Sequence, residues 1–216
     1  MFSDINNIVF AVGRITQTGI SLLGTCCLLN KKGLLVTASH VPNNDDSNLV
    51  IVNSKCTKNF YDYQDITDLN IQYSEAKIIA TDPFNDICIL KSNVHIYSTI
   101  EIGSADECVP GNSVAILGFP HADHGRLVLT EQQTNIGAKV LIENNGIKNK
   151  HLILNVQSRP GQSGSPIFDL KTKKLVAILI GSYAPYAGAI TIGGIDPQTL
   201  HQTTHAVSAE YIKDMI

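Results

Sequence analysis

The sequence predicts an all-β protein, and three observations support that class. Short runs rich in β-branched residues recur along the chain and are bounded by Gly, Pro, Asn and Asp. Long helical periodicity is nearly absent, and only residues 209–216 are typical of a helix. The chain is 44% hydrophobic and 16% charged, which is ordinary for a globular protein. Many short strands separated by turns are typical of a barrel or a sandwich, and the strand pattern leaves both open.

Six strands are expected in the N-terminal half. Each run is dominated by Val, Ile and Leu, which pack well on a pleated surface, and ends at a turn-forming residue. The expected strands cover residues 8–15, 21–29, 34–37, 49–52, 76–81 and 87–91.

The C-terminal half repeats this pattern. Strands are expected at residues 113–119, 138–143, 151–156, 166–169 and 175–180. Asn145-Gly146 is a strong hairpin signal because both residues tolerate positive φ. Gly103–Asp106 is the expected linker, which divides the chain into 1–104 and 105–216. Each half then holds about six strands, which suits two small barrels with a site between them.

Composition and charge exclude several partners and cofactors. A net charge of −3 with scattered Lys and Arg gives no reason to expect nucleic acid. The five cysteines include no Cys-x-x-Cys pair, so we expect no cofactor, no metal and no disulfide framework. The N-terminus lacks a secretion signal, which favours a cytoplasmic setting. Residues 175–195 carry no charge, but Pro185 and four glycines favour strand, loop and strand over a membrane helix.

Three segments contain residues suited to covalent catalysis. His40 follows the hydrophobic strand Leu34-Leu35-Val36-Thr37, and Asp86 directly precedes the strand at 87–91. Ser163 lies in Gly161-Gln162-Ser163-Gly164-Ser165-Pro166. A serine hydroxyl is a poor nucleophile unless an imidazole, itself held by a third group, takes its proton. The neighbouring glycines permit a tight bend in which the amides of Gly161 and Ser163 point at a developing oxyanion.

These segments resemble the three catalytic signatures of chymotrypsin-fold serine peptidases, in particular the HtrA/DegP-type branch. The resemblance extends to Gly24-Thr25, to Asp82-Pro83 with Asp86-Ile87, and to Pro110–Pro120, and it covers nearly the whole chain in order. Gly-x-Ser-Gly-Ser-Pro is also similar to the glutamyl endopeptidases. The resemblance implies two six-stranded antiparallel β-barrels with a short C-terminal helix.

The resemblance also implies the role of each residue. His40 is expected to act as general base and then acid, Asp86 to orient it, and Ser163 to attack. Gly161 and Ser163 would form the oxyanion hole. The residues expected around the primary specificity pocket are Gln157 and Ser158 at its floor, Ile180, Gly181 and Ser182 along one wall, and His205 on the opposite wall.

Some alternatives are weaker than these assignments. An esterase of the α/β-hydrolase type needs Gly where Ser165 stands, and its serine comes first in the triad order. Asp82 competes with Asp86, but Asp82-Pro83 is a turn signal, so Asp82 is expected to cap a bend. His121 and His124 could hold a metal, but no third ligand accompanies them, and a solvated loop is preferred.

The expected activity is therefore that of a serine endopeptidase acting on a protein or peptide. Gln162 replaces the aspartate that pairs with a new N-terminus in digestive zymogens, so activation by N-terminal cleavage is not expected. No aspartate lies at the expected pocket floor, so we expect a small residue at the cleaved position, with His205 pointing to acidic or glutamine substrates as an alternative. Two further alternatives are a latent enzyme that an activating protein partner switches on by ordering residues 183–205, and a protease-shaped module that binds peptides without turnover.

Overall fold

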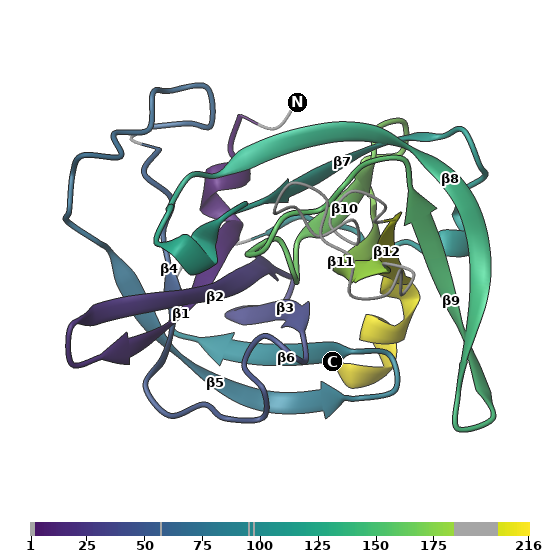
Figure 1. Cartoon of the computed structure of the whole chain (residues 1–216), viewed down its shortest axis with the longest axis horizontal. Helices are drawn as coiled ribbons and strands as arrows, with labels where there is room; N and C mark the ends of the chain where they lie inside the picture. The colour runs from purple at the N-terminus through teal and green to yellow at the C-terminus, as the bar shows by residue number, and fades with distance from the viewer. Residues whose placement is uncertain (1–2, 57, 95, 97, 184–202) are drawn as a thin grey trace, which may run out of the picture.

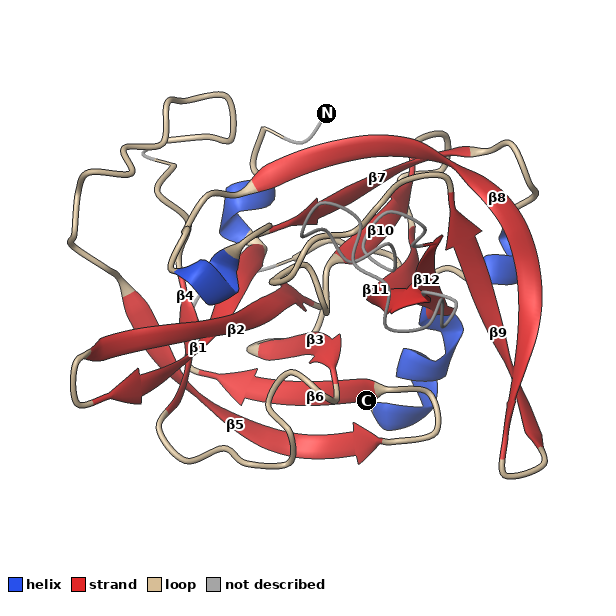
Figure 2. Ribbon diagram, in the orientation of Figure 1, coloured by secondary structure: helices blue, strands red, loops and turns tan. Residues whose placement is uncertain are grey.

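The computed structural model describes residues 3–56, 58–94, 96, 98–183 and 203–216 (Figure 1). Strands dominate, and the helices are short 3-10 turns (Figure 2). The first six strands are β1 (Val9–Thr16), β2 (Gly19–Leu28), β3 (Leu34–Ala38), β4 (Leu49–Val52), β5 (Tyr73–Asp82) and β6 (Ile87–Ser92). The other six are β7 (Ser113–Gly118), β8 (Thr130–Asn144), β9 (Ile147–Leu154), β10 (Pro166–Asp169), β11 (Leu175–Tyr183) and β12 (Thr203–Ser208). The 3-10 helices are η1 (Ile5–Asn7), η2 (Ala105–Glu107), η3 (Ala122–His124) and η5 (Ala209–Met215).

The strands form two closed antiparallel barrels with the same topology. The first has the order β1-β2-β3-β6-β5-β4, and the second, read from β7, has the order β7-β8-β9-β12-β11-β10. Closing a sheet on itself pairs both strand edges, which removes the exposed edges that promote aggregation. This confirms the two-barrel fold and settles the choice between barrel and sandwich that the strand pattern left open.

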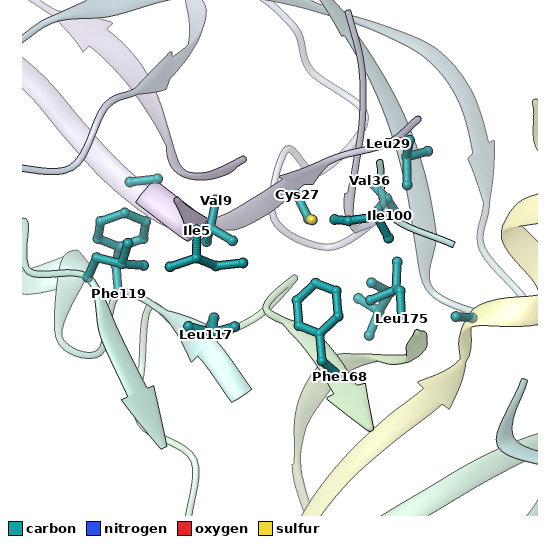
Figure 3. Packing of buried hydrophobic residues seen from close by; sticks show 14 of the residues in the cluster. Ile5, Val9, Cys27, Leu29, Val36, Ile100, Leu117, Phe119, Phe168 and Leu175 are labelled. Carbon is teal, nitrogen blue, oxygen red and sulfur yellow. The ribbon is translucent and has the colours of Figure 1, made fainter. Parts of the chain in front are cut away.

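Strand alternation explains how one chain builds three hydrophobic clusters. In β1, Val9 and Ala11 belong to the cluster between the barrels, whereas Phe10 and Val12 fill the interior of the first barrel. Successive side chains of a strand point to opposite faces, so a strand that is apolar at every position can be buried on both. Figure 3 shows the cluster between the barrels, where Phe168 from β10 lies near Cys27 and Ile100.

Most expected strands are confirmed to within a few residues, but the start of one was wrong. The strand expected at 138–143 begins at Thr130, because the polar residues before it pair with β7 from Gly118↔Thr130 to Ser113↔Asn135. Cross-strand hydrogen bonding here outweighs the weak intrinsic preference of Gln and Asn for strands. The hairpin is confirmed: Asn145 and Gly146 have φ of 51° and 83° and join β8 to β9.

The segment between the barrels packs with the second barrel at its C-terminal end. Ile102 forms a parallel bridge to Leu175, and Gly103 donates to the carbonyl of Leu175 at 2.8 Å. Ser104 caps η2 by accepting from the amide of Asp106. The domain boundary at 104/105 falls inside this segment and stays a prediction.

The uncharged stretch at 175–195 is a strand where it is described. Residues 175–183 form β11, and the rest of the stretch lies outside the described residues. No helix in the described parts of the chain has the length and apolar character needed to cross a bilayer. The expected terminal helix is confirmed as η5, which packs against β11.

Candidate active site

His40 lies just beyond the end of β3. The strand ends at Ala38, and the amide of Val41 donates to the carbonyl of Ala38, which turns the chain sharply. Val41 is buried in the core of the first barrel, so the turn is anchored, while the His40 side chain remains 47% exposed. This arrangement leaves an imidazole at the barrel surface on a backbone that cannot easily move.

Asp86 occupies the tight turn between β5 and β6. Its backbone φ is 54°, a left-handed conformation that Asp adopts more readily than bulky residues. Asp82 caps the same turn, because its Oδ1 accepts from the amides of Phe84 and Asn85 at 3.0 and 3.1 Å. Asp82 is therefore a turn residue, as expected, and Asp86 is the carboxylate that faces His40.

The carboxylate of Asp86 and the ring of His40 form a close pair. His40 Nδ1 lies 2.6 Å from Asp86 Oδ2, and the His40 amide donates to Oδ1 at 3.0 Å. Ser39 Oγ also donates to Oδ1 at 2.6 Å. Burial raises the pKa of Asp86, but the hydrogen bonds from His40 and Ser39 outweigh it and hold the pKa below its ordinary value. The carboxylate is thus charged at neutral pH, which favours a proton on Nδ1 and leaves Nε2 free to accept one.

Ser163 belongs to the second barrel, but its backbone is bound to the first. Its carbonyl accepts from the amide of Thr25 on β2 at 2.8 Å. Gly164 has φ of 84°, and a Cβ there would lie 2.1 Å from Thr25 O and 2.3 Å from Thr37 Oγ1. Only glycine permits this close approach. The serine is thereby held against β2 and against β3, the strand that leads into His40.

The structure brings Ser163 to the same two strands as His40 without a hydrogen bond between the two side chains. Ser163 Oγ has no hydrogen-bond partner within the described residues, and it is partly buried. Such contacts are often long before substrate binds, so the geometry is compatible with a nucleophile and base that meet in a substrate complex.

The loop before Ser163 is positioned by backbone contacts to β2 and to the segment after β7. Gly161 has φ of 88°, and a Cβ there would lie 2.5 Å from Phe119 O and 2.6 Å from Ala122 N. Its carbonyl accepts from Thr25 Oγ1 at 2.9 Å. The carbonyl of Pro160 accepts from the amide of His121 at 2.7 Å. Because a trans peptide points its C=O and N–H in opposite directions, this last bond fixes the direction of the Gly161 amide.

The amides of Gly161 and Ser163 donate no hydrogen bond to any other described residue. Two neighbouring free amides beside a serine are the elements of an anion-binding site. These are the two amides that the sequence resemblance assigns to an oxyanion hole, and that assignment stays a prediction.

The residues expected around the specificity pocket lie on adjacent segments. β11 and β12 pair with Gly181 opposite His205 and Ser182 opposite Thr204. Ser158 is buried, and its amide donates to Thr204 Oγ1 at 2.8 Å. Gln157 and Ile180 are partly buried. Ile180 packs against the cluster inside the first barrel and also against the cluster between the barrels.

The structure places Thr204, rather than His205, beside Ser158. Thr204 Oγ1 also donates to the carbonyl of Val156 at 2.5 Å, and Thr204 is fully buried. Neighbouring residues of a strand face opposite sides, and the His205 ring lies 3.4 Å from the hydroxyl of Thr203 on the other face of β12. Sequence reasoning missed Thr204 because a single threonine in a strand carries no signal of its own.

A second histidine, His151, lies buried near these strands. It is 5% exposed, and its Nδ1 has no hydrogen-bond partner among the described residues. Burial, with a smaller contribution from His205, lowers the pKa of His151 to about 4, and Asp86 opposes this weakly. Burial also lowers the pKa of His205. Both rings are therefore neutral at neutral pH.

The other residues that could bind a metal or react are the pair His121 and His124 and the cysteines. The rings of His121 and His124 are 6.5 Å apart, and no group of three or more possible metal ligands occurs in the described part of the chain. Cys88 is buried in the first barrel, and burial raises the pKa of its thiol to about 11. All five cysteines are free thiols.

Two curated relatives are bacterial proteases. A probable periplasmic serine endoprotease DegP-like from Pseudomonas fulva is 26% identical over 153 residues, which are 68% of this chain and 27% of that protein. A protein of the same description from Bartonella henselae is 25% identical over 173 residues, which are 78% of this chain and 30% of that protein. The chain thus spans less than a third of the length of these relatives. Their names place them in the periplasm, so they give no support to the expected cytoplasmic setting.

Two solved structures share the architecture. The MamO protease domain from Magnetospirillum magneticum has a TM-score of 0.71 and 16% identity, covering 100% of this chain and 99% of that one. The inactive form of an alanine mutant of Rv3671c from M. tuberculosis H37Rv has a TM-score of 0.64 and 15% identity, covering 97% and 84%. At these identities the likeness shows the fold alone.

The family match covers most of the chain and includes the segments described above. The trypsin-like peptidase domain matches residues 24–178, a range that contains His40, Asp86 and Ser163. It begins at Gly24, on the strand that binds the backbone of Ser163, and ends within β11. Together with the two closed barrels, this match shows that the chain belongs to the trypsin-like peptidase domain family.

Proposed function

We propose that this protein is a serine endopeptidase that cleaves peptide bonds through an acyl-enzyme, with His40, Asp86 and Ser163 as its catalytic triad. The observation that carries the proposal is the close pair of His40 Nδ1 and Asp86 Oδ2, 2.6 Å apart, next to the strands that hold the backbone of Ser163. The family match and the DegP-like relatives support the same reaction class.

In the first half of the reaction, Ser163 Oγ attacks the substrate carbonyl carbon and His40 Nε2 takes the hydroxyl proton. Asp86 stays charged and stabilises the imidazolium that forms. The negative charge that develops on the carbonyl oxygen is received by the amides of Gly161 and Ser163. Removing one such donor costs roughly 100- to 1000-fold in rate, about 3–4 kcal/mol.

In the second half, His40 returns the proton to the leaving nitrogen and the C–N bond breaks, which leaves an ester on Ser163. Water then attacks the ester carbonyl, His40 takes a proton from it, and the acid product leaves as Ser163 regains its hydrogen. The same two amides stabilise the second tetrahedral intermediate.

The residues around Ser158 do not favour a basic residue at the cleaved position, and a small residue is proposed there. The hydroxyl of Thr204 accepts from the Ser158 amide and donates to the Val156 carbonyl, so its proton is not available to a substrate group. No carboxylate is found among the residues expected to form the pocket, so nothing in this set would pair with a substrate Lys or Arg. Cleavage of a peptide library tests this, and strong cleavage after Lys or Arg would contradict it.

A fluorophosphonate probe tests the proposed nucleophile directly. The probe should label the wild-type chain at Ser163, identified by mass spectrometry, and should not label Ser163→Ala. In turnover of unfolded casein, Ser163→Ala should lower kcat by roughly a millionfold, as loss of a triad serine does elsewhere. Ser165→Ala is the matched control, since it changes a serine in the same loop while leaving the proposed nucleophile in place.

A latent form of this enzyme is the second candidate, and the unmade hydrogen bond between Ser163 Oγ and His40 favours it. A latent enzyme would label slowly alone and faster with a protein partner that orders the neighbouring loops. Residues 184–202, within the segment expected to be ordered by a partner, lie outside the described residues. If a folded protein is never labelled under any condition, the peptide-binding module without turnover is the better account.

A further inference from the structure

A groove on the surface lies outside the catalytic centre. It has a volume of about 290 Å³ and lies between residues 53–72, which join β4 to β5, and the segment that joins β7 to β8. Its apolar lining comes from Ile66, Leu69, Ile71 and Leu127, and its polar lining includes His124 and Arg126. In Figure 1 the β4–β5 loop projects on the side of the molecule that also carries η3.

The apolar side chains of the β4–β5 loop are unusually accessible. Leu69 is 88% exposed and Ile66 is 66% exposed, whereas Leu127 at the base of the groove is buried. Leaving large aliphatic side chains in water forgoes about 1.5–3 kcal/mol each in burial free energy. Contiguous exposed apolar residues that border a hollow are typical of binding sites.

The loop is nevertheless held in place. Gln64 Nε2 donates to the carbonyl of Leu129, and Gln64 Oε1 accepts from the amide of Leu129, both at 2.8 Å. A side-chain amide that satisfies both backbone groups of one residue mimics a strand pairing. The groove is therefore formed by two segments with a defined relative position.

Most charged groups at the groove lie beside a group of opposite charge, which leaves Arg126 for an anionic group. Asp65 is close enough to Lys55 to interact with it, and Asp123 Oδ1 lies 3.0 Å from His124 Nδ1. Lys55 and Asp68 neutralise each other across 3.7 Å, and Lys55 also donates to the carbonyl of Asn70. Arg126 is exposed, and its guanidinium has no partner among the described residues. An accessible guanidinium beside aliphatic side chains is suited to a carboxylate next to apolar groups.

The groove lies close to the proposed oxyanion hole. The segment that lines it at His124 and Arg126 also contacts the loop before Ser163, because Ala122 packs against Gly161 and His121 donates to Pro160. Only Asp123 lies between Ala122 and His124, so their Cα atoms are at most about 7 Å apart. A polypeptide bound at Ser163 therefore needs only a few further residues to reach the groove.

We propose that this groove is an exosite that binds an acidic and apolar segment of the polypeptide substrate, outside the residues at the scissile bond. Ile66, Leu69 and Ile71 would bury the apolar side chains of that segment, and Arg126 would pair with its carboxylate. The assignment to a substrate rests on the proposed endopeptidase function, whereas binding of the segment itself does not.

Binding to the full chain carrying Ser163→Ala tests the site without turnover. The probe is a short fluorescein-labelled peptide in which Leu and Phe alternate with Asp and Glu, followed by fluorescence anisotropy. Leu69→Ser should weaken binding about tenfold, and Arg126→Ala by about threefold, with a smaller effect of Arg126→Ala at high salt. The matched controls Leu141→Ser and Lys148→Ala change exposed residues of the β8–β9 hairpin and should leave the Kd unchanged.

Kinetics of the active chain then test the substrate assignment. Leu69→Ser should raise KM for an acidic protein substrate and leave kcat/KM for a short chromogenic peptide unchanged. If neither substrate were turned over, that result would contradict the proposed endopeptidase function. The anisotropy measurement would still test binding at the groove.

Three outcomes would overturn the exosite. The first is a Kd for the acidic peptide that is the same in Leu69→Ser, in Arg126→Ala and in the chain without these substitutions. The second is equally tight binding of a peptide in which Lys and Arg replace the acidic residues. The third is a dimer in sedimentation equilibrium that Leu69→Ser dissociates, since the groove would then be an interface between two copies of the chain.

Discussion

Asp86 contacts both the backbone and the ring of His40: Oδ1 lies 3.0 Å from the His40 amide and Oδ2 lies 2.6 Å from Nδ1. The carboxylate thus fixes the position of the residue and the tautomer of its ring together. Because Asp86 has a left-handed backbone conformation in a turn capped by Asp82, this contact depends on the local structure of the β5–β6 connection.

Asp86→Asn should reduce kcat by roughly ten-thousandfold while the fold is kept, because an amide that donates to Nδ1 imposes the wrong tautomer on His40. The rate of fluorophosphonate labelling or of peptide hydrolysis measures this. Asp82→Asn is the matched control, since Asn keeps an oxygen for the amides of Phe84 and Asn85 and loses only the acceptor of the Asn85 side chain. A similar loss of rate in both variants would mean that the turn, and not the carboxylate, is responsible.

Ser39→Ala should raise the pKa of Asp86 toward its ordinary value, since it removes one of the hydrogen bonds that lower that pKa. A carboxyl whose folded pKa is depressed adds stability above its unfolded pKa, near 3.9, and that stability is lost as the pH falls through the folded value. The variant should therefore lose this contribution at a higher pH than the wild type. Carbon NMR titration of the carboxyl checks it, with the exposed Ser21→Ala as control.

Gly164→Ala should destabilise the protein by about 2 kcal/mol more than Gly146→Ala. Both glycines have φ near 84°, so each substitution carries the left-handed penalty of about 1–2 kcal/mol. Only at Gly164 does the added Cβ meet backbone, at 2.1 Å from Thr25 O, whereas at Gly146 nothing lies within 4 Å. Urea unfolding compares the two, and equal losses would contradict the close packing of the Ser163 loop on β2.

His151→Gln should reduce the loss of stability between pH 7 and pH 5. The folded pKa of His151, about 4, lies below the ordinary value near 6.5, so the unfolded chain binds the proton first and stability falls as pH drops through that range. Urea unfolding at the two pH values measures the difference. An unchanged slope in His151→Gln would show that His151 is not the buried neutral group inferred.

Thr204→Val should lower the free energy of unfolding by about 1–3 kcal/mol, because the Ser158 amide and the Val156 carbonyl both lose their partner in a buried place. It should also broaden cleavage-site preference if this threonine shapes the pocket. Thr203→Val, on the exposed face of the same strand, is the control and should change stability by less than about 0.5 kcal/mol. If the two variants changed cleavage-site preference equally, Thr204 would not be part of the specificity pocket.

The order and approximate position of the strands were predictable because alternation and turn residues are local properties. Asn145-Gly146 predicts its own hairpin, and β4 and β10 occupy the expected residues. The first half of β8 was missed because its strand conformation depends on pairing with β7, which no local pattern contains.

The candidate catalytic residues were predictable as types in order, since His40 and Asp86 lie near strand ends and Ser163 lies in a Gly-rich loop motif. Their spatial relationships were not. The Asp86–His40 contact joins residues 46 positions apart, and the Thr25–Gly161 bond joins residues 136 positions apart.

The amino-acid sequence alone determined the all-β class, the hairpin, the capping role of Asp82 and the choice of Ser163 as candidate nucleophile. Tertiary structure decided that both halves close into barrels of the same topology, that Thr204 and not His205 lies beside Ser158, and that His151 is buried with no partner for Nδ1 among the described residues. The reason is physical: turns and alternation follow from neighbouring residues, whereas barrel closure and side-chain neighbours follow from contacts between distant strands.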